Sequence, residues 1–228
     1  MKIKMLNKKS IAALALSAAL VLTGCGLSNT AKGTGIGAGA GALIGAGVGR
    51  VLGNTAIGAA IGGVVGGTAG ALIGKKMDKQ KKELERDVKD AKIESVNDGQ
   101  AIRVTFDSGI LFATGSASLS STSQATLRKF AANLSEHSDT DLMIIGHTDN
   151  TGTDRVNNPL SYNRAASVRS FLAGQGVSSS RMKVEGKGSY EPVADNSTVA
   201  GRRENRRVEV YILPSKEMVK AAQDGTLR

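Results

Sequence analysis

The second half of the chain alternates between the hydrophobic spacing of strands and that of helices. Residues 102, 104 and 106 are apolar with polar residues between them, which predicts a half-buried strand. Apolar residues at i, i+3, i+4 and i+7 across 127–134 predict an amphipathic helix, and a similar spacing returns at 165–172 before a pair of glycines. Further strands are predicted at 142–145, 182–184 and 208–212. The pattern predicts one domain at residues 99–214, with helices on one face of a sheet.

The segments on either side of this domain have weaker patterns. Residues 75–98 are rich in alternating charge and carry only a thin apolar stripe, formed by Met77, Leu84, Val88 and Ala91. This stripe predicts a solvated helical spacer with charge pairs along the helix, although a charged linker fits the composition equally well. Residues 215–228 are predicted to be a short surface tail.

Glycine dominates the segment before the spacer. Of the 29 glycines, 16 lie between residues 33 and 74, and they recur every fourth residue in two series. The series occupy positions 37, 41, 45, 49 and 53, and then 58, 62, 66, 70 and 74. A four-residue period places each series on one helix face, where small residues let two membrane helices approach closely. We therefore predict a two-helix membrane hairpin at residues 35–74, with a flexible low-complexity linker as the alternative.

The N-terminus has the organisation of an export signal. Four lysines precede an apolar core at residues 11–22, which is too short to span a bilayer. The core ends in Leu-Thr-Gly followed by Cys25, the single cysteine of the chain, and this junction resembles a bacterial lipobox. The resemblance implies a signal peptide at 1–24, lipid on Cys25 and a linker at 25–34. Because no Asp follows Cys25, the sorting rules of enterobacteria favour the outer membrane, with the inner membrane left open.

Composition narrows the function classes. The formal charge of +10 includes the four lysines of the signal, and the remaining segments are nearly balanced, so no part forms a strongly basic body that would favour nucleic acid. One cysteine excludes an internal disulfide, and two histidines make a metal site improbable. No cofactor is predicted.

Several motifs of the C-terminal domain carry a family resemblance. They are Gly-His-Thr-Asp at 146–149, Asn157, Leu-Ser at 160–161, Arg-Ala at 164–165, Val168 and Asn-Arg-Arg-Val-Glu at 205–209. In this order they resemble the OmpA-like peptidoglycan-binding domain. The resemblance implies an α+β fold, a βαβαβ two-layer sandwich, and a ligand that is the diaminopimelate of the peptidoglycan stem peptide. Together with the lipobox and the glycine zipper, the whole chain resembles an envelope lipoprotein of the YiaD type.

The chemistry of that ligand points to two residues. Diaminopimelate presents an ammonium and a carboxylate on one carbon, so a binder needs an anion and a cation close together. Asp149 follows a predicted strand and suits the ammonium, while Arg164, in the next helix, suits a forked pair with the carboxylate. The resemblance adds Asn157 and the loop from Thr148 to Thr151. The alternative is a solvated ion pair between Asp149 and Arg164, which contributes about 0–1 kcal/mol.

Other candidate sites are weaker. His147, Asp149 and Ser161 form a triad on paper, but no nucleophile motif surrounds the serine. Four arginines, at positions 202, 203, 206 and 207, form a basic cluster with no aromatic residue beside it to stack on a base. The family pattern places Asn205, Arg206 and Arg207 at the entry to the final strand, where a structural ion pair is expected.

These observations predict a binding protein rather than an enzyme. The leading hypothesis is a tether, with lipid in a membrane and the C-terminal domain on the cell wall. The alternative is a membrane or assembly factor that oligomerises through the glycine zipper, with wall binding serving only to position it. A wall-cleaving enzyme lacks a catalytic constellation in the sequence.

Overall fold

The computed structural model describes residues 65–113 and 115–228. The predicted lipid attachment site at Cys25, the predicted signal peptide and the predicted first glycine helix lie outside the described residues. Helices are α3 (Gly67–Asp87), α4 (Ser108–Leu111), α5 (Ser121–Glu136), α6 (Asp154–Gly174), α7 (Val199–Asn205) and α8 (Lys216–Gln223), with a short 3₁₀ turn, η1 (Ser179–Arg181). Strands are β1 (Lys92–Val96), β2 (Ala101–Asp107), β3 (Thr140–Gly146), β4 (Met182–Gly186) and β5 (Arg207–Pro214).

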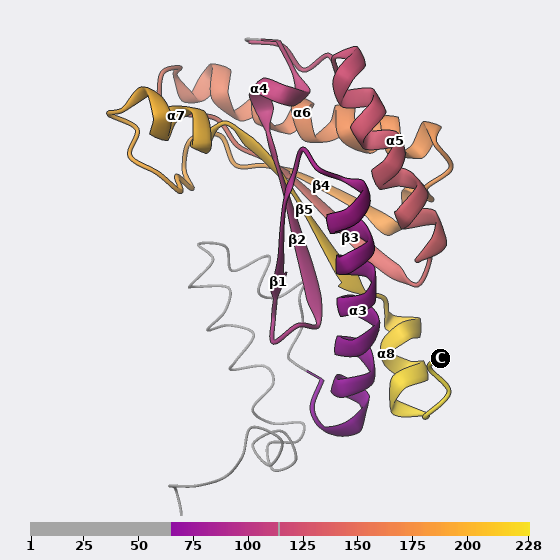
Figure 1. Ribbon diagram of the computed structural model, residues 1–228. Helices are drawn as coiled ribbons and strands as arrows, with labels where there is room; N and C mark the ends of the chain where they lie inside the picture. Colours follow the sequence, from indigo (N-terminus) through magenta and orange to yellow (C-terminus); the bar gives the residue numbers. More distant parts are fainter. Residues whose placement is uncertain (1–64, 114) are drawn as a thin grey trace, which may run out of the picture.

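The five strands form one sheet in the order β1-β2-β5-β3-β4. Only β3 and β4 are parallel, and the other neighbours are antiparallel. Helices α3, α5 and α6 lie against the sheet (Figure 1), and their apolar residues form the main core with residues such as Val104, Phe106, Ile144 and Val210. The predicted α+β class, the helices on one sheet face and the strands at 102–106, 142–145, 182–184 and 208–212 are confirmed.

Strand β1 is absent from the sequence prediction, which placed a helical spacer over residues 75–98. Its five residues carry only two large apolar side chains, so the alternation is too short to recognise. The stronger signal is the turn that follows, where Asn97, Asp98 and Gly99 all have positive φ. Asn, Asp and Gly are the residues that tolerate this conformation, and they join β1 to β2 as a hairpin.

Helix α3 crosses the predicted boundary between the glycine hairpin at 35–74 and the spacer at 75–98, and it joins the domain that was predicted to begin at residue 99. It begins at Gly67, inside the predicted second glycine helix, and runs through residue 74 without a break. Its buried face consists of Ala69, Gly70, Ile73, Met77, Gln80 and Leu84. The apolar stripe of the sequence is therefore a packing surface rather than the thin stripe of a solvated spacer. The stripe looked thin because a glutamine occupies one turn, where the Gln80 side-chain amide donates to Asn133 Oδ1 at 3.0 Å.

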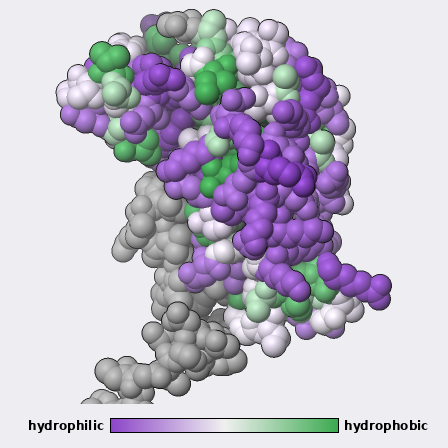
Figure 2. Space-filling model, in the orientation of Figure 1, coloured by the Kyte–Doolittle hydropathy of each residue, from purple (hydrophilic) through white to green (hydrophobic). Residues whose placement is uncertain are grey.

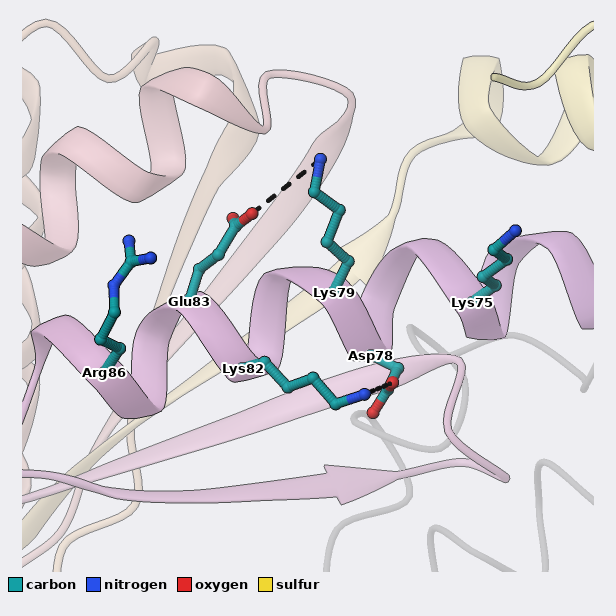
Figure 3. A pocket seen from close by; sticks show the side chains of 6 residues that line it. All are labelled: Lys75, Asp78, Lys79, Lys82, Glu83 and Arg86. Atoms are coloured by element: carbon teal, nitrogen blue, oxygen red, sulfur yellow. Dashed lines mark ion pairs between the residues drawn. The ribbon is translucent and has the colours of Figure 1, made fainter.

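The opposite face of α3 carries charges to solvent. Figure 3 shows Lys75, Lys79, Lys82 and Arg86 along this face with Asp78 and Glu83 between them. Lys82 pairs with Asp78 at 2.7 Å, one turn apart, which is the helix charge pairing expected from the sequence. The same side of the molecule is mostly hydrophilic in Figure 2. In the described part of the chain, no helix combines the length and apolarity that crossing a membrane requires.

The C-terminal tail is also corrected. Residues 216–223 form α8, which packs on α3 and buries Met218 and Ala222 (Figure 1). Ser215 caps this helix by accepting a hydrogen bond from the backbone N–H of Met218 at 3.1 Å. Two apolar residues four positions apart were too few to predict a packed helix, because only the docked α3 supplies the surface they cover.

Candidate functional site

The loop that leaves β3 is fixed at the end of the sheet. The backbone N–H of His147 donates to the carbonyl of Arg207 at 2.9 Å, and that of Thr148 donates to the carbonyl of Gly188 at 2.8 Å. Gly146 lies so close to α6 that a Cβ there would be 2.0 Å from the Ser161 carbonyl oxygen. The strand end and the first turns of α6 are therefore held together, and Asp149 lies between them.

Asp149 is 5 % exposed and accepts three hydrogen bonds through its carboxylate. The backbone N–H of Thr151 donates to Oδ1 at 3.0 Å, and the Thr151 hydroxyl donates to the same oxygen. Arg206 Nη1 donates to Oδ2 at 2.5 Å. Burial raises the pKa of Asp149, but the hydrogen bonds from Thr151 and Arg206 outweigh this and hold the pKa below its ordinary value. The carboxylate is therefore ionised at neutral pH.

Asn157 shapes the loop from inside. Its side-chain amide donates to the Asp149 carbonyl at 3.1 Å and to the Gly152 carbonyl at 2.9 Å. The loop closes tightly over it, because a Cβ on Gly152 would lie 2.7 Å from Asn157 Oδ1. Within the described residues, the buried Thr148 hydroxyl has no hydrogen-bond partner. Asn157 therefore fixes the loop that carries Asp149. The hydroxyl of the preceding residue, Thr148, remains without a hydrogen-bond partner among the residues that the structure describes.

Arg164 lies on the third turn of α6, and it is 3 % exposed. Its Nε donates to the Ser116 carbonyl at 3.0 Å, and its guanidinium carbon lies 5.4 Å from the centre of the Phe112 ring. Its Nη1 is buried without a hydrogen-bond partner in the described part of the chain. Burial lowers the pKa of Arg164, and the positive charge of Arg206 lowers it further, while Asp149 opposes both. A buried guanidinium with a free donor is suited to bind an anion.

The structure brings together the residues singled out from the sequence and adds one. Hydrogen bonds join Asp149, Thr151 and Asn157. Burial lowers the pKa of Arg164 and the charge of Asp149 opposes that shift, but the two side chains form no ion pair. The alternative of an ion pair between Asp149 and Arg164 is wrong, because Asp149 pairs with Arg206. The sequence grouped Arg206 with its neighbours as a structural ion pair at the last strand. The sequence signal for a separate role of Arg206 is its position directly before β5. Successive side chains along an extended chain point to opposite sides, so Arg206 and Arg207 reach different partners.

The triad drawn from the sequence is not assembled. His147 is buried, and in the described residues neither ring nitrogen has a hydrogen-bond partner. The Ser161 hydroxyl donates to the Asn158 carbonyl at 2.8 Å and accepts from the backbone N–H of Gly188. Burial lowers the pKa of His147 to about 3, and the nearby Arg207 contributes to this shift. The imidazole is neutral at pH 7 and is in no position to activate the serine.

The arginine cluster is divided among different partners. Arg203 pairs with Asp107 at 2.8 Å and Arg207 with Glu209 at 2.6 Å, whereas Arg202 donates to the carbonyls of Asn196 and Ser197. The cluster is therefore no continuous basic surface. Among the described residues, no group of His, Cys, Asp and Glu is arranged to hold a metal ion.

Two family models match the chain. Residues 111–206 match the OmpA family, and residues 5–78 match the YMGG-like Gly-zipper. The C-terminal domain is OmpA-like. The Gly-zipper match reaches residue 78, so it overlaps the first half of α3, which the structure packs into the OmpA-like domain.

Individual relatives agree with this assignment. The chain is 36% identical over 138 residues to "Probable lipoprotein YiaD" of Escherichia coli K12, an alignment that covers 60% of this chain and 63% of that protein. It is 38% identical over 112 residues to "Peptidoglycan-binding protein ArfA" of Mycobacterium tuberculosis H37Rv, covering 49% of this chain and 34% of that one. The chain thus spans about two thirds or less of the length of the curated relatives it matches.

Solved structures show the same domain. The cell wall anchor of the T6SS from Pseudomonas aeruginosa is 32% identical, with a TM-score of 0.54, and the match covers 60% of this chain and 97% of that one. A MotB-like protein from Desulfovibrio vulgaris matches with a TM-score of 0.57 at 22% identity, covering 64% of this chain and 96% of that one, which supports the fold alone.

Proposed function

We propose that this chain is an envelope lipoprotein that binds the diaminopimelate stem peptide of peptidoglycan without forming a covalent bond and tethers a membrane to the cell wall. Its OmpA-like domain is related to a protein named for peptidoglycan binding and to a cell wall anchor, and these relatives support wall binding. Because the relatives named above are binding or structural proteins, we assign this chain no enzymatic reaction.

The observation that carries the proposal is the pair formed by an ionised Asp149 and a buried Arg164 with a free Nη1. An ammonium and a carboxylate on one carbon would satisfy both residues at once, since the ammonium donates to Asp149 and the carboxylate accepts from Arg164. Charge-assisted hydrogen bonds of this kind are roughly twice as strong as neutral ones. Thr151 and Asn157 hold Asp149 in place for this contact.

The placement of this site within the domain supports a tether. Val65 is clamped by Gln100, whose side-chain amide donates to the Val65 carbonyl and accepts from its N–H, both at 2.9 Å. Gln100 precedes β2, whereas the site lies beyond the other end of that strand, about 20 Å away at roughly 3.3 Å per residue. Figure 1 shows α4 and α6 at one end of the domain and the start of α3 at the other. The chain that leads back to Cys25 therefore leaves the end away from the site.

Muropeptide pull-down tests wall binding. Asp149→Asn and Arg164→Gln should each reduce retention of the protein on diaminopimelate-containing wall by about tenfold or more, the effect of losing one charge-assisted bond. Arg155→Gln is the matched control, because Arg155 lies exposed on the same helix as Arg164. Wild-type retention of both site variants, with unchanged melting, would show that the site lies elsewhere.

The anchor is tested separately. We propose that the lipid on Cys25 anchors the protein in the outer membrane, with the chain on the periplasmic side. Cys25→Ser should then abolish labelling by palmitate and release the protein from the membrane. Persistent labelling of this variant would remove the lipoprotein assignment. Attachment through acyl chains follows from roughly 0.8 kcal/mol for each buried CH₂ group.

The Gly-zipper match supports a second candidate, an oligomerising membrane or assembly factor in which wall binding only positions the protein. Leucine at Gly41, Gly45, Gly58 and Gly62 tests it, because these positions precede α3 and leave the OmpA-like domain untouched. Smaller oligomers with wall binding retained would support the zipper candidate. Unchanged oligomer size and membrane association would leave the tether as the function.

A further inference from the structure

We propose that Arg206 forms a subsite for a second carboxylate of the ligand, next to the Arg164 Nη1 that takes the first carboxylate, and that Arg206 occupies the place of the ligand ammonium on Asp149 until the ligand arrives. The subsite would select stem peptides that carry one ammonium and two carboxylates over peptides in which one carboxylate is amidated. This inference rests on the proposed function, and it adds a determinant of ligand choice.

The charges at the site are unequal. Asp149 contributes one negative charge, and Arg164 and Arg206 contribute two positive charges. In the described part of the chain, these are the charged neighbours that act on Arg164, and no other acidic residue compensates it. The excess charge is borne by a guanidinium that is 3 % exposed and has an unpaired Nη1. Burying an unpaired donor costs stability, and a ligand that brings an extra anion removes this cost.

The two oxygens of Asp149 are used differently. Oδ1 accepts from the backbone and hydroxyl of Thr151, both within the loop, whereas Oδ2 accepts from Arg206. A ligand ammonium would therefore compete with Arg206 for Oδ2 and leave the Thr151 contacts intact. The Arg206 side chain is 37 % exposed, against 7 % for Asp149, so it is the partner that is free to turn toward solvent.

Displacement of Arg206 creates the need for the second carboxylate. Once an ammonium neutralises Asp149 and one carboxylate neutralises Arg164, the Arg206 guanidinium has lost its anion. Arg206 directly precedes β5, and its carbonyl accepts from the backbone N–H of Ser108 at 2.9 Å, so its backbone stays at the site. A second carboxylate on the ligand would pair with the released guanidinium, whereas a carboxamide at the same position would not.

Binding of two synthetic stem peptides tests the proposal. Both end in diaminopimelate and have the same ammonium and the same first carboxylate, but in one of them the second carboxylate is a carboxamide. The full chain should bind the dicarboxylate peptide about tenfold more tightly, as expected for one half-exposed charge-assisted contact. Arg206→Gln should weaken binding of the dicarboxylate peptide and tighten binding of the carboxamide peptide, because competition for Asp149 disappears.

Controls separate this subsite from a structural role. Arg203→Gln alters an arginine three residues away that pairs with Asp107 and is 68 % exposed, and it should leave the preference unchanged. Arg206→Lys keeps the charge and should retain part of the preference. Equal weakening of both peptides by Arg206→Gln, or no preference in the parent, would overturn the subsite. If the parent bound neither peptide, the proposed function itself would fail, and the subsite with it.

Discussion

Arg206 and Arg207 are neighbours in the chain but belong to two clusters that differ in charge balance. The Arg207 cluster is neutral, whereas the Arg206 cluster has an excess positive charge. Arg207 pairs with Glu209 at 2.6 Å, and its remaining nitrogens donate to the carbonyls of Asn205 and Glu191. The Tyr211 hydroxyl donates to the other oxygen of Glu209 at 2.8 Å. Arg206 joins Asp149 and Arg164, where two cations share one anion.

The difference distinguishes the structural ion pair of Arg207 from the proposed binding site. In the Arg207 cluster, Arg207 and Glu209 neutralise each other and each guanidinium nitrogen of Arg207 has a hydrogen-bond acceptor, so this ion pair offers nothing to a ligand. In the Arg206 cluster, a buried donor of Arg164 lacks a partner in the described residues. Unsatisfied buried polar groups cost stability, and a ligand that supplies the missing partner to Arg164 would remove this cost.

The largest test breaks the structural ion pair of Arg207. Arg207→Met leaves Glu209 buried and unpaired and should lower the free energy of unfolding by about 3–5 kcal/mol. Arg203→Met removes an exposed pair and should leave the free energy of unfolding nearly unchanged. Urea unfolding measures both. Adding Glu209→Gln to Arg207→Met should recover much of the loss, and a cost for Arg207→Met as small as that of the control would contradict the comparison.

The free energy of unfolding is expected to fall in acid because of His147, which lies beside the Arg207–Glu209 ion pair. Burial lowers the pKa of His147 to about 3, and the imidazole lies 4.0 Å from Glu209. Because the unfolded pKa is about 6.5, the unfolded chain binds the proton more readily, and stability falls as pH drops below that value. The loss approaches about 1.4 kcal/mol per pH unit down to the folded pKa. His147→Gln should flatten this slope between pH 6 and 4 in urea unfolding, and an unchanged slope would contradict the assignment.

Two glycines at the start of α3 test how closely this helix packs against the Val65–Gln100 clamp. A Cβ on Gly70 would lie 1.8 Å from the Val65 carbonyl oxygen, whereas a Cβ on Gly74 meets nothing within 4 Å. Gly70→Ala should lower the free energy of unfolding by about 1–3 kcal/mol, and Gly74→Ala should raise it by about 0.5–1 kcal/mol. Thermal melting compares the two variants. Equal effects would mean that the Val65–Gln100 clamp does not hold the start of the helix.

The smallest stability effect is expected at the proposed binding site. Arg164→Met removes a buried charge that forms no ion pair within the described residues and relieves repulsion with Arg206, so the free energy of unfolding should change by about 1 kcal/mol or less. The same variant should lose wall binding in the pull-down. A loss of stability as large as that of Arg207→Met would give Arg164 a structural role instead of a place in the site.

Much of the domain was predictable because its signals are local. Alternating apolar residues predicted β2 and β5, a short apolar run predicted β3, and helical spacing predicted α5 and α6. Asp149, Arg164 and Asn157 were predicted as site residues through motifs, and they remain part of the proposed site. Strand β1 was missed because it has too few apolar residues, and α8 because its buried face covers a helix distant in sequence.

The sequence by itself determined the order of segments, the α+β class and the two residues of opposite charge that the proposed ligand requires. Only the tertiary structure decided how charges pair, because partners such as Asp149 and Arg206 are 57 residues apart. It also decided that α3 belongs to the domain, since the Gln80 amide that completes its buried face finds its acceptor on α5. A polar side chain is read as exposed until the fold supplies a buried partner, and that partner is set by packing rather than by local sequence.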